Sequence, residues 1–225
     1  MHPKVLRRLR SAAGFLLLFV LGMPRTVFGL DPNRKLTQYV HRIWQAQQGL
    51  PQGGILEIIQ TREGYLWLAT QTGLVRFDGV RFQQVEDIIP GAPPNLWIRA
   101  ASEDQRGNLW LGSNESGLFR LGPGGVKQFT TAQGLPSNGI QCLVPGRDGV
   151  IWVCTESGLA RLETSGNEPR ILGPENEFNL ASQNVRAACV DPSGGLWIGG
   201  DGPVVQRQWR LQLLHHYQLR KRSDR

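Results

Sequence analysis

Histidine and cysteine are scarce in this chain of 225 residues, which contains four histidines and three cysteines. Only His41 lies between the first 29 residues and the last 22. A histidine-based metal site or a nucleophile–base pair needs several such side chains close together, so neither can readily be built here. The cysteines and histidines also lack the spacing of metal ligands. We therefore expect no metal and no other cofactor.

Motifs that bind phosphate or calcium are absent as well. The sequence contains neither a P-loop nor a D-x-D-x-D-G calcium loop. It also offers no pair of carboxylates that would converge on a substrate. The sequence therefore predicts that this chain is not itself an enzyme.

The net charge of +7 does not arise from the main part of the chain. Residues 1–29 and 204–225 each carry a net charge of +5, which leaves residues 30–203 with a net charge of −3. A nucleic-acid site needs a basic face, so this mildly acidic body is not expected to bind nucleic acid.

The first 29 residues have the pattern of a secretory signal peptide. Lys4, Arg7, Arg8 and Arg10 precede the apolar run 12–22, and Gly29 ends a segment suited to cleavage. The alternative is an uncleaved membrane anchor, but the run is shorter than the roughly 20 residues that a spanning helix needs. We expect cleavage near Gly29 and a periplasmic or secreted protein.

One segment occurs four times, as GYLWLAT (64–70), GNLWLGS (107–113), GVIWVCT (149–155) and GGLWIGG (194–200). Its tryptophans are separated by 43, 42 and 45 residues. An apolar residue also stands twelve positions before each tryptophan, so this interval has a fixed length. A period of this size with strand-like composition is typical of stacked β-sheet units. The four tryptophans are Trp67, Trp110, Trp152 and Trp197.

Each repeat predicts a small antiparallel sheet. In the first repeat we expect strands at 55–60, 65–69, 74–77 and 81–85, separated by turns rich in glycine and polar residues. Four antiparallel strands in about 43 residues form a blade of a β-propeller. The sequence thus predicts an all-β, partial β-propeller of about four blades at 46–206. It would follow the signal peptide (1–29) and a closing strand (30–45), and precede a basic tail (207–225) that is not repeat-like.

The strands around the four tryptophans are apolar on both faces. A sheet that is buried on both sides has this composition. We therefore expect the tryptophans to pack between blades rather than to contact a ligand.

The repeats resemble the two-component regulator propeller family. The pattern G-x-L-W-(I/L/V)-(G/A)-(T/S), followed by G-(L/V)-x-(R/K)-(F/L), fits residues 64–77, 107–121 and 149–162. The connectors at 49–51 and 134–136, both Gly-Leu-Pro, are also typical of this family. Such repeats form the periplasmic sensor of bacterial receptors, commonly hybrid histidine kinases and sometimes diguanylate cyclases. Hybrid members are associated with the sensing of polysaccharide breakdown products.

The resemblance implies the ligand-sensing propeller of a two-component signal-transduction receptor, without its kinase module. The alternatives are an extracellular carbohydrate-active enzyme and a stand-alone secreted binding module. Because the family usually has seven blades per ring, we interpret the four copies as the N-terminal part of a longer receptor, ended by truncation or by a shifted reading frame. A four-bladed protein is the other possibility. The expected partners are an oligosaccharide or another small polar ligand, and further copies that cover unpaired blade faces or form a receptor homodimer.

Loops at one edge of the predicted blades would supply a ligand face. Their amides and hydroxyls, together with one aromatic side chain, suit a neutral hydroxylated ligand. Trp97 has no equivalent in the other repeats, and its alternative role is to close its loop onto the core. The candidate residues are Gln52, Asn95, Trp97, Asn114, Ser137, Asn138 and Asn184.

Cys142 and Cys154 are expected on the first two strands of the third repeat, at similar distances from the turn between them. An oxidising compartment would permit a disulfide. The geometry of a cross-strand bridge is demanding, however, and Cys189 leaves an odd count. We expect two buried free thiols.

Overall fold

The computed structural model describes residues 35, 42–51, 53–166, 168–173 and 183–201, and the backbone of Val205–Gln208. The chain divides into two units, Met1–Ile43 and Trp44–Arg225, and all the strands that the structure describes belong to the second. The expected signal peptide, most of the closing strand and basic tail, and Gln52 lie outside the described residues. No helix within the described ranges has the length and apolarity needed to cross a membrane.

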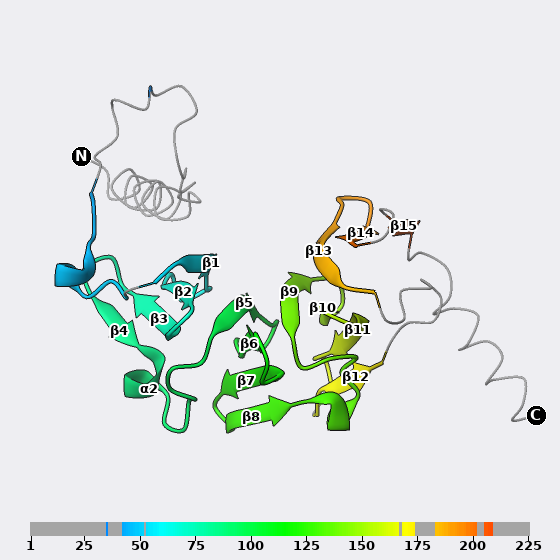
Figure 1. Ribbon diagram of the computed structural model, residues 1–225, viewed down its shortest axis with the longest axis horizontal. Helices are drawn as coiled ribbons and strands as arrows, with labels where there is room; N and C mark the ends of the chain where they lie inside the picture. The colour runs from blue at the N-terminus through cyan, green and yellow to red at the C-terminus, as the bar shows by residue number, and fades with distance from the viewer. Residues whose placement is uncertain are drawn as a thin grey trace, which may run out of the picture. The chain divides into compact units, whose positions relative to one another are not determined.

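The second unit contains one antiparallel sheet for each sequence repeat, and successive strands of the chain are neighbours in every sheet (Figure 1). This arrangement confirms the predicted blades. The first sheet comprises β1 (Ile55–Gln60), β2 (Leu66–Thr70), β3 (Gly73–Phe77) and β4 (Phe82–Gln84). The second comprises β5 (Ile98–Glu103), β6 (Leu109–Ser113), β7 (Leu118–Gly122) and β8 (Gly125–Phe129). The third comprises β9 (Ile140–Pro145), β10 (Val150–Thr155), β11 (Gly158–Glu163) and β12 (Arg170–Leu172). The described part of the fourth comprises β13 (Val185–Val190), β14 (Gly195–Gly200) and β15 (Val205–Gln208).

The outer strand of the first sheet is shorter than the sequence predicts. β4 ends at Gln84, and Val85 instead begins the short helix α2 (Val85–Ile88). Glu86 and Asp87 lie in the first turn of this helix, where negative charge is favourable. The side chain of Val85 is buried in the core between the first two sheets, which holds the helix in place.

The two Gly-Leu-Pro connectors have the same conformation. Each follows a single 3-10 turn, η2 (Ala46–Gln48) or η3 (Thr131–Gln133). Gly49 and Gly134 then adopt φ angles of 91° and 103°, a left-handed conformation that glycine adopts without steric cost. The following Leu135 is buried, so the connector fastens this turn to the core between the second and third sheets.

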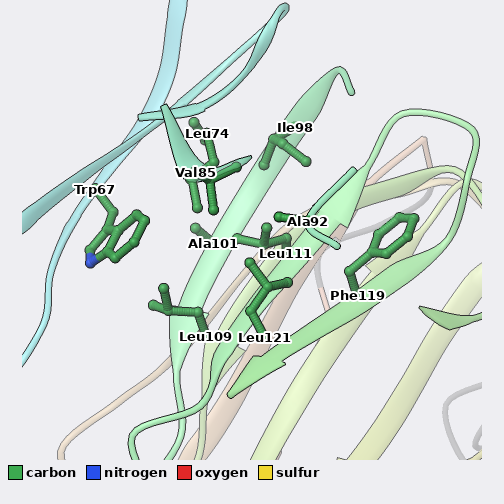
Figure 2. Close-up of a cluster of buried hydrophobic side chains, with 11 residues drawn as sticks. Trp67, Leu74, Val85, Ala92, Ile98, Ala101, Leu109, Leu111, Phe119 and Leu121 are labelled. Carbon is green, nitrogen blue, oxygen red and sulfur yellow. The ribbon is translucent and has the colours of Figure 1, made fainter. Parts of the chain in front are cut away.

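Neighbouring sheets pack face to face through three apolar clusters. Figure 2 shows the first, in which Trp67 and Leu74 of the first sheet meet Ile98, Leu111 and Phe119 of the second. In the next two clusters, Trp110 lies with residues of the third sheet and Trp152 with residues of the fourth. Each of these tryptophans therefore packs against the following sheet. Their exposed fractions are 5%, 0% and 4%, whereas Trp197, in the fourth sheet, is 38% exposed.

Arginines in the turns between the first two strands of a sheet connect neighbouring sheets. Arg62 donates to the carbonyl oxygens of Asp104 (2.8 Å) and Gln105 (2.7 Å). In the same way, Arg147 donates to the carbonyl oxygen of Pro192 at 2.6 Å. These bonds join neighbouring sheets at one edge. The loops at the opposite edge make different contacts.

Cys142 and Cys154 form a disulfide, so the expectation of free thiols is wrong. The register of the β9–β10 hairpin makes the two residues direct cross-strand partners, with their Cα atoms 4.9 Å apart. This separation lies in the range that a disulfide requires. Cys189 is a free, exposed cysteine.

Candidate functional site

A β-bulge interrupts the inner hairpin at the same place in every sheet. In the second sheet, Ile98 pairs with Ser113 and Ala100 pairs with Gly112, so Arg99 is the extra residue. A bulge changes the direction of the side chain of the extra residue and bends the strand. The four extra residues, called the bulge residues below, are Leu56, Arg99, Gln141 and Arg186.

The bulge residues were not among the candidates predicted from the sequence. A strand that is buried on both faces is apolar throughout, so an extra residue does not interrupt the apolar pattern in its sequence. Their signal is positional, because each lies eleven residues before the tryptophan of its repeat.

The loops that precede the inner strands lie beside the loops that follow the tryptophan strands. The backbone N–H of Asn114, after β6, donates to the carbonyl oxygen of Trp97, before β5, at 2.9 Å. Gly117 at the far end of the same loop donates to the carbonyl oxygen of Asn138, before β9, at 2.9 Å. The loops of the second and third sheets therefore form one continuous edge, which we call the polar edge.

Arg99 is the centre of a hydrogen-bond network on this edge. Its Nε donates to Asn114 Oδ1 at 2.6 Å, and its Nη1 donates to Gln141 Oε1 at 2.7 Å. Its Cζ lies 5.5 Å from the centroid of the Trp97 ring, which is within the range of a cation–π contact. Trp97 is 39% exposed. The network therefore joins the second and third sheets, and the Trp97 ring next to it is partly exposed.

Two carboxylates fix the orientation of the amides in the network. Asn114 Nδ2 donates to Glu115 Oε1 at 3.3 Å, and Gln141 Nε2 donates to Glu156 Oε1 at 3.2 Å. Because the amide nitrogens are engaged by Glu115 and Glu156, the amide oxygens remain directed at Arg99. Gly139 leaves room for this arrangement, since a Cβ there would lie 2.5 Å from Glu156 Cδ.

The fourth sheet has an ion pair at the equivalent positions. Arg186 Nε lies 2.9 Å from Asp201 Oδ1, and both side chains are more than half exposed. Asp201 stands four residues after Trp197, as Asn114 stands four residues after Trp110. The bulge arginine of the second sheet thus faces an amide where that of the fourth faces a carboxylate.

The structure brings only some of the candidate residues into this network. Trp97 and Asn114 belong to it, whereas Ser137 and Asn138 hold their own loop by accepting the N–H groups of Gly139 and Thr131. The remaining two described candidates lie elsewhere. Asn95 is an exposed turn residue with a φ of 52°, and Asn184 has a buried Oδ1 that accepts no hydrogen bond from any described residue.

Some carboxylates outside the network also have shifted pKa values, and burial or hydrogen bonds within the fold cause these shifts. Burial alone would raise the pKa of Asp104, but hydrogen bonds from Asn108, Trp110 and Arg106 outweigh it and lower the pKa. Hydrogen bonds from Ser193, Trp197 and Gly195 lower the pKa of Asp191 to about 2. Glu57 lies between the first two sheets, where burial raises its pKa although it accepts the N–H of Ala101. No group of three or more His, Cys, Asp or Glu residues is placed to bind a metal within the described ranges.

Three segments of the chain match the family described as Two component regulator propeller. They are residues 92–115, 134–157 and 179–202. The first two begin in the loop that precedes an inner strand and end in the loop that follows the tryptophan strand. The matched segments therefore contain the bulge residues Arg99, Gln141 and Arg186. No curated protein matches the chain in sequence.

Solved structures share the fold at low sequence identity. The extracellular domain of a hybrid two component system, BT3049 from B. thetaiotaomicron, is 23% identical with a TM-score of 0.56, over 69% of this chain and 20% of that one. PorZ, a surface component of the type-IX secretion system of Porphyromonas gingivalis, is 18% identical with a TM-score of 0.56, over 72% and 26%. Virginiamycin B lyase from Staphylococcus aureus is 10% identical with a TM-score of 0.50, over 71% and 57%. These similarities establish a β-propeller fold, and the chain spans about a fifth of the first of these proteins.

Proposed function

We propose that this chain, which carries two component regulator propeller repeats, is part of the ligand-sensing region of a bacterial signalling receptor. The observation that carries the proposal is the position of the matched segments, because two of them, 92–115 and 134–157, supply the loops that meet at the polar edge. Two similar solved structures are extracellular domains of two-component or one-component systems. Since the chain covers only about a fifth of each, the activity of a complete receptor belongs to the proposal as well.

The proposed location is the periplasm, after cleavage near Gly29. The pattern of residues 1–29 supports export, and the Cys142–Cys154 disulfide fits an oxidising compartment. N-terminal sequencing of the protein recovered from a periplasmic extract tests this location. A mature chain that begins near residue 30 is expected, and an intact Met1 on protein found in the cytoplasm would contradict it.

The proposed ligand is a small hydroxylated molecule such as an oligosaccharide. Exposed aromatic rings stack on the apolar faces of sugars, and side-chain amides hydrogen-bond to hydroxyl groups. The polar edge provides an exposed aromatic ring and side-chain amides. Calorimetric titration of the full chain with a panel of neutral and acidic oligosaccharides identifies a ligand. Trp97→Ala should then weaken binding about tenfold, which corresponds to about 1.4 kcal/mol.

Trp197→Ala is the matched control for this experiment. Trp197 is 38% exposed, close to the 39% of Trp97, but its indole Nε1 donates to Asp191 near the opposite end of the sheet. The control variant should retain the affinity of the wild-type chain. Equal affinities of the wild-type and Trp97→Ala chains would contradict the assignment of the polar edge as the ligand face.

We place the chain among binding proteins rather than enzymes. Its likeness to virginiamycin B lyase concerns the fold alone, at 10% identity. Incubation of the purified chain with the polysaccharide from which its ligand derives distinguishes the two classes. An unchanged polymer length is expected, and shortening of the polymer would favour a carbohydrate-active enzyme.

A further inference from the structure

Arg99 and Arg186 occupy equivalent positions but differ in their charge partners. Arg186 forms an ion pair with Asp201, whereas the residue in the equivalent position to Asp201 in the second sheet is Asn114. No carboxylate among the described residues lies within ion-pair distance of Arg99. Within the described part of the chain, Arg99 therefore has no direct ion-pair partner, whereas Arg186 at the equivalent position has one.

Arg99 is nevertheless held in one orientation. Asn114 and Gln141 accept hydrogen bonds from its Nε and Nη1, and no described residue accepts one from its Nη2. A guanidinium is a planar group with five N–H donors, and it binds a carboxylate best through two parallel hydrogen bonds. The network thus orients the group through neutral acceptors and leaves donors for a ligand.

The amides are themselves held, so the orientation of Arg99 does not depend on a ligand. Glu115 and Glu156 accept hydrogen bonds from the nitrogen atoms of Asn114 and Gln141. These carboxylates engage the amide nitrogens, while Arg99 engages the amide oxygens. A site that is oriented before binding loses less conformational entropy when the ligand arrives.

Trp97 adds an apolar surface next to the charge. Its ring is 39% exposed and its centroid lies 5.5 Å from Arg99 Cζ. A partly exposed aromatic ring next to a guanidinium that keeps unused N–H donors suits a ligand that carries a carboxylate on a ring with an apolar face. We propose that Trp97, Arg99 and Asn114 form a binding site for an acidic sugar residue, with Arg99 binding the carboxylate and Trp97 stacking on the ring. This inference deepens the proposed sensing function and depends on it.

The test compares one oligosaccharide with and without its charge. The full chain is titrated calorimetrically with trigalacturonate and with the methyl ester of the same trisaccharide, at a fixed salt concentration. The wild-type chain should bind the acid at least about tenfold more tightly than the ester, because charge-assisted hydrogen bonds to a carboxylate are lost in the ester. Equal affinity of the wild-type chain for both trisaccharides would overturn the inference. It would leave the proposed sensing function intact, since a hydroxylated ligand would still be bound.

Three variants separate a binding role of Arg99 from a purely structural one. Arg99→Ala should abolish the preference for the acid, and Asn114→Asp should do the same while preserving shape, because it gives Arg99 the carboxylate partner that Arg186 has. Arg186→Ala is the matched control and should keep the preference. Far-UV circular dichroism confirms that each variant is folded, and the near-isosteric Asn114→Asp provides the test if Arg99→Ala does not fold.

Two further outcomes would overturn the inference. If folded Asn114→Asp still prefers the acid to the ester, the charge of Arg99 does not contribute to binding of the ligand's carboxylate. Equally tight binding of inorganic phosphate and trigalacturonate would show a site for anions in general, without selection of a sugar ring. If folded wild-type chain binds neither trisaccharide nor any other member of the oligosaccharide panel, the proposed sensing function fails together with this inference.

Discussion

Removal of the Asp104 carboxylate should destabilise the propeller more than the loss of any other side-chain acceptor in the described turns between the first two strands of the sheets. Asp104 is only 4% exposed and lies in the turn between β5 and β6. Its Oδ1 accepts the backbone N–H groups of Arg106 and Asn108, and its Oδ2 accepts Asn108 Nδ2 and Trp110 Nε1, each at 2.9 Å. One carboxylate thus closes the turn and satisfies the indole of a fully buried tryptophan.

The magnitude follows from what Asp104→Ala leaves behind. Trp110 is 0% exposed, so its indole N–H would have neither a protein partner nor ready access to water. A buried donor left without a partner costs about 1–3 kcal/mol, and the loss of the turn hydrogen bonds adds about 1 kcal/mol. We expect a total loss of about 2–4 kcal/mol, a large part of the roughly 5–15 kcal/mol that stabilises a typical domain.

Urea unfolding followed by far-UV circular dichroism measures this loss as a lower midpoint with an unchanged slope. Asp104→Asn separates the backbone bonds of the turn from the side-chain bonds, because its Oδ1 still closes the turn while its amide nitrogen opposes Asn108 Nδ2 and Trp110 Nε1. Asp191→Ala is the matched control: Asp191 accepts the indole of Trp197 at 3.0 Å, but that indole belongs to a residue 38% exposed, so water can replace the bond. Equal losses for the two alanine variants would refute the reasoning, because burial of the donor is its premise.

The same carboxylate predicts a pH dependence. Because the folded state holds the pKa of Asp104 below its ordinary 3.8, its contribution to stability is complete above that pH. The contribution is lost as the pH falls below 3.8, and Asp104→Asn should lack this acid-induced loss. If the wild-type and Asp104→Asn chains lose stability equally below pH 3.8, Asp104 is not the source of the acid-induced loss.

Burial raises the pKa of Glu57 above its ordinary 4.5. Above pH 4.5 the folded protein therefore retains a proton that the unfolded chain has released. Stability should fall as the pH rises from 4.5 through the raised pKa. Glu57→Gln should remove that fall in melting temperatures measured above pH 4.5, and an unchanged profile would argue against it. Gly112→Ala should cost about 1–3 kcal/mol, because the new Cβ would overlap Ile140 Cγ2 between the second and third sheets. Combining it with Ile140→Ala, which removes Cγ2, should cost less in urea unfolding than the sum of the two single losses, and strict additivity would exclude the clash. Reduction of the Cys142–Cys154 disulfide, which closes a loop of sequence separation 12, should destabilise the protein by about 3 kcal/mol. A Cys142→Ser, Cys154→Ser double variant should unfold at a lower urea midpoint that no longer responds to reductant, and a wild-type midpoint insensitive to reductant would count against the bridge.

The strands could be predicted from the sequence because the same pattern of apolar, glycine and polar residues occurs in each repeat. β1 lies at Ile55–Gln60 as expected, and Trp67, Trp110 and Trp152 pack between sheets as the apolar strands indicated. Trp197 follows the same local pattern but is 38% exposed. Burial between sheets depends on a following sheet, which is a property of the neighbour and not of the repeat itself.

The candidate site was predicted only in part, for a related reason. Composition drew attention to loop amides and to Trp97, and the loops do meet at one edge. It could not reveal that Arg99 is the extra residue of a bulge, because register belongs to the pairing of two strands. The Cys142–Cys154 pair shows the same limit: equal distances from a turn indicate proximity, but only the ladder makes the two residues direct partners.

The four repeats also show where this fold can acquire a specific function. Positions that pack between sheets must fit the same neighbour each time, so the tryptophan and the apolar residues beside it hardly differ between repeats. The bulge residues and the residues four positions after each tryptophan lie outside that packing, and no two repeats have the same pair of residues at these positions. Leu56 with Gln71 is uncharged, Arg186 with Asp201 is neutralised, and Gln141 with Glu156 lacks a cation of its own. Only Arg99 with Asn114 combines a positive charge with a neutral partner, and beside it stands Trp97. Recognition of a ligand by one edge of a repetitive fold requires such asymmetry, and among the described residues the boundary between the second and third sheets provides it.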